Sequence, residues 1–131
     1  MKLKLISIAA ALSLALVAHA QELVVKIGQT GPLSGPNAYA GKDNERGTRL
    51  AIEELNTQKI KLGGKTLTFQ LRSEDDQCDP KAGVSVAQKL VDEGVKYVMG
   101  PYCSGVAIPA SRIYAAGAHG GYHSATSSID S

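Results

Sequence analysis

The sequence predicts an α/β fold built on a parallel, doubly wound sheet. Three segments have the composition of strands, and each is followed by a segment with the periodicity of an amphipathic helix. Glycine and proline residues separate these segments, as expected of short surface loops. A chain that alternates strand and helix in this way forms right-handed crossovers, and such crossovers build a parallel sheet.

The first 20 residues are predicted to be a cleaved signal peptide that is not part of the fold. Lys2 and Lys4 precede an apolar run, residues 5–17, that is too short to span a membrane comfortably. Residues 18–20, Ala-His-Ala, have the small-x-small pattern of a cleavage site, so the mature chain is expected to begin at Gln21. A membrane anchor is the alternative. Residues 21–131 would then form the folded part.

The composition argues against nucleic acid as a partner. The chain has 14 basic and 12 acidic side chains, and removal of Lys2 and Lys4 would leave 12 of each. Aromatic residues make up 5% of the chain, and tryptophan is absent. Such a chain has neither the basic surface nor the stacking platforms that bind nucleic acids. Its length suits about one small domain.

The first strand is predicted over residues 23–28, an apolar run suited to a buried position. The loop that follows, residues 28–37, is dense in glycine and proline. It contains neither the GxGxxG nor the GxxxxGK[ST] pattern that holds nucleotide phosphates, so a nucleotide site is excluded. The loop is therefore either a plain turn or a segment that lines a ligand site.

The first helix is predicted over residues 41–56, with Asp43 or Asn44 as its N-cap. The charged residues of this helix would point outward, away from the sheet. The residues expected to face the sheet are Gly47, Leu50, Ala51 and Leu55.

The second strand is predicted from an alternation in which Leu67, Phe69 and Leu71 are separated by polar residues. A glycine pair, residues 63–64, marks the turn before this strand.

An acidic run after the second strand raises the question of a metal site. Glu74, Asp75, Asp76 and Asp79 lack the glycine, the spacing and the terminal glutamate of a calcium loop. We interpret them as loop acids, with Asp79 as the N-cap of a second helix because Pro80 follows at the first helical position. The buried stripe of this helix is expected to be Val84, Ala87, Leu90 and Val91, with Gly94 as its stop.

The third strand and the helix after it contain the main candidate site. Residues 97–99 suit a buried strand, which ends at the Gly100-Pro101 pair. Ser104 then begins a helix-compatible segment in which Ile113 and Tyr114 face inward. Ligands of α/β sheets bind where strands end and helices begin, and exposed backbone N–H groups there suit an anion such as a carboxylate. The alternative is that Ser104 only caps the helix.

Two cysteines remain after the leader, Cys78 and Cys103. In a secreted chain one disulfide is the simple expectation. A reactive Cys103 is the alternative, although the chain offers it no CxxC partner and no evident His–Asn set.

Short motifs between residues 24 and 114 match one protein family in order and spacing. These motifs are Gly31-Pro32-Leu33-Ser34-Gly35-Pro36-Asn37, Gly41-Lys42-Asp43-Asn44, Leu50-Ala51-Ile52-Glu53-Glu54-Leu55-Asn56, Asp75-Asp76-Gln77-Cys78-Asp79-Pro80-Lys81, Val95-Lys96-Tyr97-Val98-Met99-Gly100, Cys103-Ser104, Pro109-Ala110-Ser111 and Ile113-Tyr114. On them the chain resembles the periplasmic leucine/isoleucine/valine-binding proteins, the receptors of branched-chain amino-acid ABC transporters.

The resemblance implies a type I periplasmic binding protein, in which two lobes close over the ligand. Residues 21–131 would be an incomplete first lobe, with the second lobe absent. The implied function is that of a periplasmic, monomeric receptor that binds leucine, isoleucine, valine or a related amino acid. It would deliver this ligand to an inner-membrane permease. The resemblance implies no catalysis, no cofactor and no metal.

The same resemblance implies roles for individual residues. The family pairs cysteines at the positions of Cys78 and Cys103, and Ser104 matches a serine that binds the ligand carboxylate. Ser124, Ala125 and Thr126 match a turn after the fourth strand. There the threonine hydroxyl and backbone groups bind the ammonium and carboxylate of the ligand. The alternative is that residues 124–128 are a small polar turn.

Two segments depart from the family pattern. Ala40 occupies the position of an aromatic that packs on the ligand side chain, and Tyr39 precedes it. Residues 117–123 include a glycine pair and two histidines where a buried strand is expected, and about one residue is missing. A locally shifted reading frame is one hypothesis. A metal site formed by His119 and His123 is another, although the glycines oppose the helix it needs.

The chain ends at Ser131, before the expected second lobe. One lobe leaves half of the ligand in water, so we expect weak binding or none from this chain, and poor folding. Two alternative functions stay open. One is a sensory amino-acid or amide-binding module that is not linked to transport. The other is a secreted hydrolase fragment that pairs Ser34 or Ser104 with one of the histidines.

Overall fold

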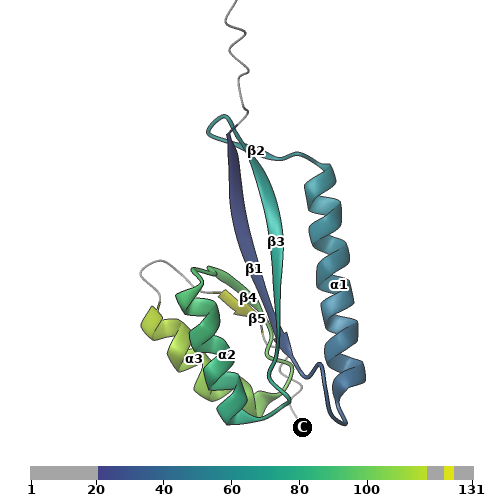
Figure 1. The fold of residues 1–131 in the computed structure, drawn as a ribbon, viewed down its shortest axis with the longest axis vertical. Coiled ribbons are helices and arrows are strands. Elements are labelled where there is room, and N and C mark those ends of the chain that lie inside the picture. Colours follow the sequence, from purple (N-terminus) through teal and green to yellow (C-terminus); the bar gives the residue numbers. More distant parts are fainter. Residues whose placement is uncertain (1–20, 118–122, 126–131) are drawn as a thin grey trace, which may run out of the picture.

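The computed structural model describes residues 21–117 and 123–125, and it confirms the α/β prediction. In chain order the elements are β1 (Glu22–Gly31), α1 (Ala38–Thr57), β2 (Lys61–Leu62), β3 (Lys65–Asp75), α2 (Pro80–Asp92), β4 (Tyr97–Met99), α3 (Ser104–Gly117) and β5 (His123–Ala125). The strands form one sheet in the order β2-β3-β1-β4-β5 (Figure 1). All neighbouring pairs are parallel except β2 and β3, which form a short antiparallel hairpin across the predicted glycine turn.

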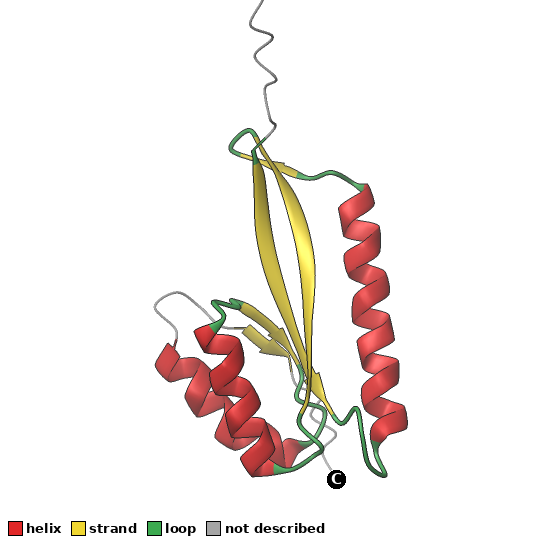
Figure 2. Cartoon of the chain, viewed as in Figure 1, coloured by secondary structure: helices red, strands yellow, loops and turns green. Residues whose placement is uncertain are grey.

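The strand order determines which helix covers which face. The crossover from β1 to β3 runs in one direction along the sheet, and the crossovers to β4 and β5 run in the other. Because such crossovers are right-handed, α1 lies on one face and α2 and α3 lie on the other. Figure 2 shows this division, with the two shorter helices side by side and α1 alone across the sheet.

The core lies between the sheet and the α2–α3 pair. It consists of Ala87, Leu90, Val95, Val98, Ala110 and Tyr114. Helix α2 follows its prediction closely. Asp79 is its N-cap and accepts a 2.8 Å hydrogen bond from the Ala82 N–H, Pro80 is its first residue, and Gly94 follows its end. In α3 the predicted inward residue Tyr114 is 3% exposed.

The predictions for α1 were wrong in two respects. The helix begins at Ala38, so Asp43 and Asn44 lie inside it, and its N-cap Asn37 makes no side-chain capping bond. Three of the four residues predicted to face the sheet, Gly47, Ala51 and Leu55, do lie on its side of the helix, but they line an open groove and are not buried in a core. Leu50 is 66% exposed, and Ile52 is buried instead.

Two contacts account for the orientation of α1. Gly41 packs so closely on the loop after β1 that a Cβ atom there would lie 2.0 Å from the carbonyl oxygen of Pro32. At the other end, the Asn56 side chain accepts from the Phe69 N–H at 2.8 Å and donates to the Phe69 carbonyl at 2.9 Å. These contacts anchor both ends of α1, so tertiary contacts determine its inward face.

The fourth parallel strand is formed by His123–Ala125, with Ser124 opposite Val98 and Ala125 opposite Met99. The prediction that Ser124 and Ala125 lie in a turn after this strand is therefore wrong. His119 and Thr126 lie outside the described residues. Within the described part of the chain, no helix is both long enough and apolar enough to cross a bilayer.

Candidate functional site

The candidate site is at the carboxyl end of the parallel strands, where three loops meet. These are residues 32–37 after β1, residues 76–79 after β3, and residues 100–103 after β4. This edge of an open α/β sheet is where ligands usually bind. Strand β4 ends at Met99. Gly100, the next residue, has a φ of 100° and lies so close to Thr30 that a Cβ atom would meet the Thr30 carbonyl oxygen at 2.2 Å.

A disulfide joins two of the three loops. Cys78 and Cys103 are bonded to each other, with their Cα atoms 5.5 Å apart. The predicted pairing is confirmed, and the alternative of a free, reactive Cys103 is wrong. The bond connects the β3–α2 loop to the residue that immediately precedes α3, so it restrains the start of that helix.

Ser104 is the first residue of α3 and is exposed. The N–H groups of Val106 and Ala107 both donate to the Cys103 carbonyl at 3.0 Å, so Cys103 occupies the capping position. The interpretation of Ser104 as the N-cap is therefore wrong. The first N–H groups of a helix have no partner within the helix and carry its partial positive charge, and at the start of α3 these are the groups of Ser104 and Gly105. A helix N-terminus of this kind generally favours anions.

The other residues predicted to contact the ligand lie at the start of α1 and in β5. Tyr39 lies in the first turn of α1 and is 71% exposed, and Ala40 beside it is half-buried. Ser124 and Ala125 lie in β5 next to β4, so the end of β5 is at the same sheet edge as Gly100.

The acidic residues at the end of β3 each make a different contact, and Glu74 and Asp75 belong to the strand itself and not to a loop as predicted. The Asp75 carboxylate accepts from residues of both the first and the second loop. Asp76 is fully buried, and burial raises the pKa of its carboxyl group, although the Cys78 N–H donates to it at 3.0 Å. Glu74 pairs with Lys89 at 2.6 Å. In the described residues, no three His, Cys, Asp or Glu side chains are grouped to hold a metal ion.

The sequence analysis did not predict an apolar groove of about 680 Å³ on the α1 face of the sheet. It lies between α1 and the β4 end and is lined by Ile27, Gln29, Thr30, Asp43, Asn44, Gly47, Thr48, Ala51, Ile52, Leu55, Met99, Gly100, Pro101 and Tyr102. Neither Ser104 nor Tyr39 lines it.

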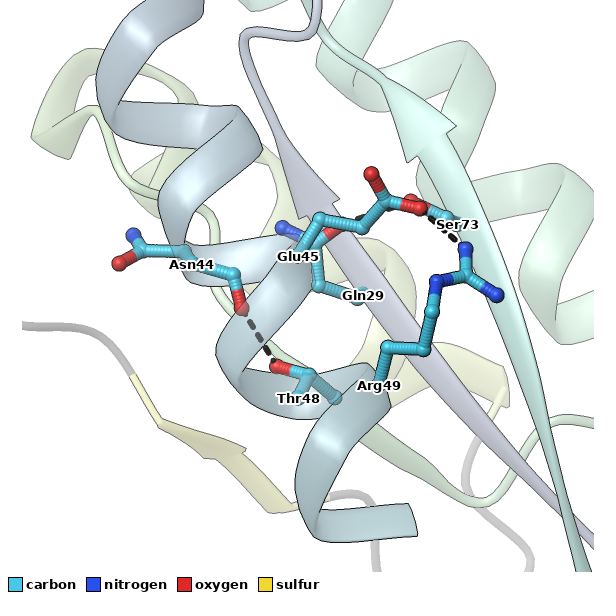
Figure 3. Close-up of polar contacts among 6 residues, drawn as sticks. All are labelled: Gln29, Asn44, Glu45, Thr48, Arg49 and Ser73. Atoms are coloured by element: carbon cyan, nitrogen blue, oxygen red, sulfur yellow. Dashed lines mark hydrogen bonds and ion pairs between the residues drawn. The ribbon is translucent and has the colours of Figure 1, made fainter. Parts of the chain in front are cut away.

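Two of the polar side chains at this groove, Gln29 and Thr48, are hydrogen-bonded within the protein, whereas the buried Thr30 hydroxyl has no partner among the described residues. Buried Gln29 accepts from the Ser73 hydroxyl at 2.8 Å (Figure 3). Its side-chain amide also donates to the Thr30 carbonyl at 3.1 Å. Thr48 donates to the Asn44 carbonyl, also shown in Figure 3. The groove is thus separate from the start of α3, because Ser104 does not line it.

Comparison with known proteins gives a consistent result. Residues 24–124 match the family model described as periplasmic binding protein. A Leu/Ile/Val-binding protein of Rhizobium johnstonii is 40% identical over 109 residues, which cover 83% of this chain and 28% of the relative. A Leu/Ile/Val-binding protein of Citrobacter freundii is 40% identical over 104 residues, covering 79% of this chain and 27% of the relative.

Solved structures agree with this comparison. The branched-chain amino acid transporter substrate binding protein LivJ of Streptococcus pneumoniae, in complex with isoleucine, superposes with a TM-score of 0.64 at 27% identity, covering 72% of this chain and 27% of that one. A solute binding protein of Rhodopseudomonas palustris in complex with benzoate has a TM-score of 0.56 at 30% identity, covering 69% and 24%. This chain therefore spans about a quarter of the length of these proteins.

Proposed function

The chain belongs to the periplasmic binding protein family, and from this premise we propose that it forms part of a receptor that binds branched-chain or related amino acids for uptake by an ABC transporter. The observation that carries the proposal is the start of α3, where Ser104 and free helix N–H groups are held next to the β3–α2 loop by the Cys78–Cys103 disulfide. This arrangement suits the carboxylate of an amino acid.

The ligands of the solved relatives support the carboxylate as the shared feature. One relative binds isoleucine and another binds benzoate, which differ in size, shape and the ammonium group. Both ligands carry a carboxylate on an apolar body. We assign the carboxylate to Ser104 and Gly105, and the apolar body to the side of Tyr39 and Ala40.

Further residues complete the proposal by resemblance. Ser124 and Ala125 reach the same sheet edge through β5, and we assign them, with Thr126, to the ammonium and carboxylate of the ligand. The proposed setting is the periplasm after removal of residues 1–20, with a monomeric receptor and an inner-membrane permease as its partner. The relatives are substrate-binding proteins of transporters, and nothing supports the hydrolase or sensory alternatives.

The proposal is tested by titrating the isotope-labelled chain with leucine and following the backbone amide signals by NMR. We expect weak binding, because one sheet edge leaves one side of the ligand in water. The amides of Ser104 and Gly105 should shift with leucine. Leucinol has the same side chain and ammonium group but no carboxylate, so it should leave these two amides unmoved.

Two variants test whether leucine binding depends on the Ser104 hydroxyl or on any serine of α3. Ser104→Ala should weaken leucine binding by about tenfold or more, as expected for a hydrogen bond to a charged group. Ser111→Ala removes an exposed hydroxyl elsewhere on α3, which bonds only the Ile108 carbonyl, and should change nothing. Equal shifts with leucinol, or shifts confined to the groove beside α1, would contradict the assignment. A benzoate titration shows whether the site also accepts aromatic acids.

A further inference from the structure

Asp75 is the last residue of β3, and both of its carboxylate oxygens accept hydrogen bonds. Oδ1 accepts from the N–H of Leu33 at 2.8 Å and from the N–H of Gln77 at 2.9 Å. Oδ2 accepts from the Ser34 hydroxyl at 2.5 Å. Leu33 and Ser34 belong to the loop after β1, whereas Gln77 belongs to the loop after β3. One carboxylate therefore bonds to two loops that are more than 40 residues apart in the chain.

These bonds begin where the sheet ladder ends. The pairing of β1 with β3 runs to Gly31 opposite Asp75, and the Asp76 N–H then donates to the Gly31 carbonyl at 3.1 Å. Beyond this point the two strands separate into loops that are not paired with each other. Where the backbone pairing of β1 and β3 ends, the Asp75 side chain connects the loops that follow these two strands.

Two further contacts extend the connection to α3. The Asn37 side chain donates to the Cys78 sulfur at 3.6 Å, so the first loop touches the disulfide as well. The disulfide then leads to Cys103, directly before Ser104. All three loops of the candidate site are thus joined in one series of contacts, and Asp75 is the charged group within it.

The hydrogen bonds keep the Asp75 carboxyl ionised. Partial burial acts to raise its pKa, but the bonds from the Ser34 hydroxyl and from the backbone of Leu33, Gln77 and Ser34 outweigh burial and lower the pKa below that of a free aspartate. The neighbouring acids have other partners. Glu74 pairs with Lys89, and Asp76, the neighbouring acid whose carboxyl feels the charge of Asp75, accepts from the Cys78 N–H.

We propose that Asp75 is a positioning residue, whose carboxylate couples the β1–α1 loop to the β3–α2 loop and thereby sets the geometry of the edge that ends in Ser104. The effect on ligand binding rests on the function proposed above. The coupling of the two loops does not, since it concerns only contacts within the chain.

The coupling is tested without any ligand, by an NMR pH titration of the labelled chain. An amide that donates to a carboxylate shifts when that carboxylate is protonated. The amides of Leu33 and Gln77 should therefore titrate together, although they lie on different loops, with one common midpoint below that of a free aspartate. Ser34→Ala removes one donor and should raise this midpoint at both amides.

Exchange rates give a second measurement. Asp75→Asn removes the negative charge, so Oδ1 becomes a weaker, neutral acceptor for the N–H groups of Leu33 and Gln77, and exchange at both amides should accelerate by about tenfold. Asp75→Glu, which restores the charge, should recover part of the protection. The matched control is Asp43→Asn in α1, whose side chain is 72% exposed and, among the described residues, pairs with Arg46 at 3.1 Å. Exchange at both amides should stay unchanged in this variant.

Separate midpoints for the two amides, a midpoint equal to that of a free aspartate, or unchanged exchange in Asp75→Asn would each overturn the proposal. Leucine titration of the same variant distinguishes the two proposals. If the amides titrate together but the leucine response at Ser104 is the same in Asp75→Asn, the loops are coupled without effect on binding, and the positioning role is overturned. If the parent chain shows no response to leucine, the proposed function fails while the amide titration still decides the coupling.

Discussion

The two faces of the sheet are held by different kinds of contact. On the α2–α3 face, six buried side chains form a continuous core, and Leu90 and Val95 at its centre are fully buried. On the α1 face, Ile52 is the one large apolar side chain of α1 that is buried. There α1 is held at its ends by Gly41 against Pro32 and by Asn56 against the backbone of Phe69.

This difference means that one face contributes most of the stability of the fold, while the other mainly determines where a helix and a loop lie. Burial of a leucine or valine side chain contributes about 1.5–3 kcal/mol, so most of the apolar stabilisation comes from the α2–α3 face. A hydrogen bond contributes about 1 kcal/mol net, but it is directional and fixes which way a helix or loop lies. The α1 face therefore positions the loop after β1 with little core of its own and leaves an apolar groove beside β4.

The sharpest test of this comparison is one substitution made on both faces. Leu90→Ala should lower the free energy of unfolding by about 4 kcal/mol, because it opens a cavity at a fully buried site. Leu50→Ala on α1 should change it by less than about 0.5 kcal/mol, because that side chain is 66% exposed. Urea unfolding followed by circular dichroism measures both. Equal losses would show that the two faces contribute alike.

A second test removes the covalent connection at the loop edge. The double variant Cys78→Ala/Cys103→Ala opens a loop with a sequence separation of 25, and we expect a loss of about 3 kcal/mol. The effect should be greatest at the start of α3. The amide of Phe69, held by Asn56 on the other face, should keep its exchange protection relative to global unfolding. An unchanged unfolding midpoint would contradict this expectation.

The smallest effect concerns the two helix N-caps. Asp79→Ala should cost about 1 kcal/mol, because it removes the 2.8 Å bond from the Ala82 N–H at the start of α2. Asn37→Ala at the corresponding position of α1 should lower the free energy of unfolding much less than Asp79→Ala does, since Asn37 makes no capping bond. Thermal unfolding of both variants compares them. A larger loss for Asn37 would mean that its contact with the Cys78 sulfur matters more for stability than helix capping does.

Helix α2 shows how far local signals extend. Its start is encoded by Asp79 and Pro80, its end by Gly94, and its buried stripe by the period of its apolar residues, and all three agree with the structure. Each of these signals acts within a few residues, so they can be recognised in the sequence. The disulfide was also predicted from the sequence, since two cysteines in a chain that is expected to be secreted leave one pairing.

The Asp75 contacts show where local signals end. Asp75 was interpreted as one of several loop acids, but its partners Leu33 and Ser34 are more than 40 residues away. The contacts that anchor α1 were missed in the same way, because Pro32 and Phe69 lie outside the helix. Such contacts exist only once the sheet brings distant segments together.

The sequence by itself determined the alternation of strands and helices, the boundaries of α2, the residue pair of the disulfide and the position of Ser104 at a strand exit. These depend on periodicity and on short-range chemistry. Only the tertiary structure decided that α1 faces the sheet through Gly41 and Ile52, that Ser124 lies within a strand, and that one carboxylate connects two loops. The physical reason is that these features depend on packing and hydrogen bonds between segments far apart in the chain.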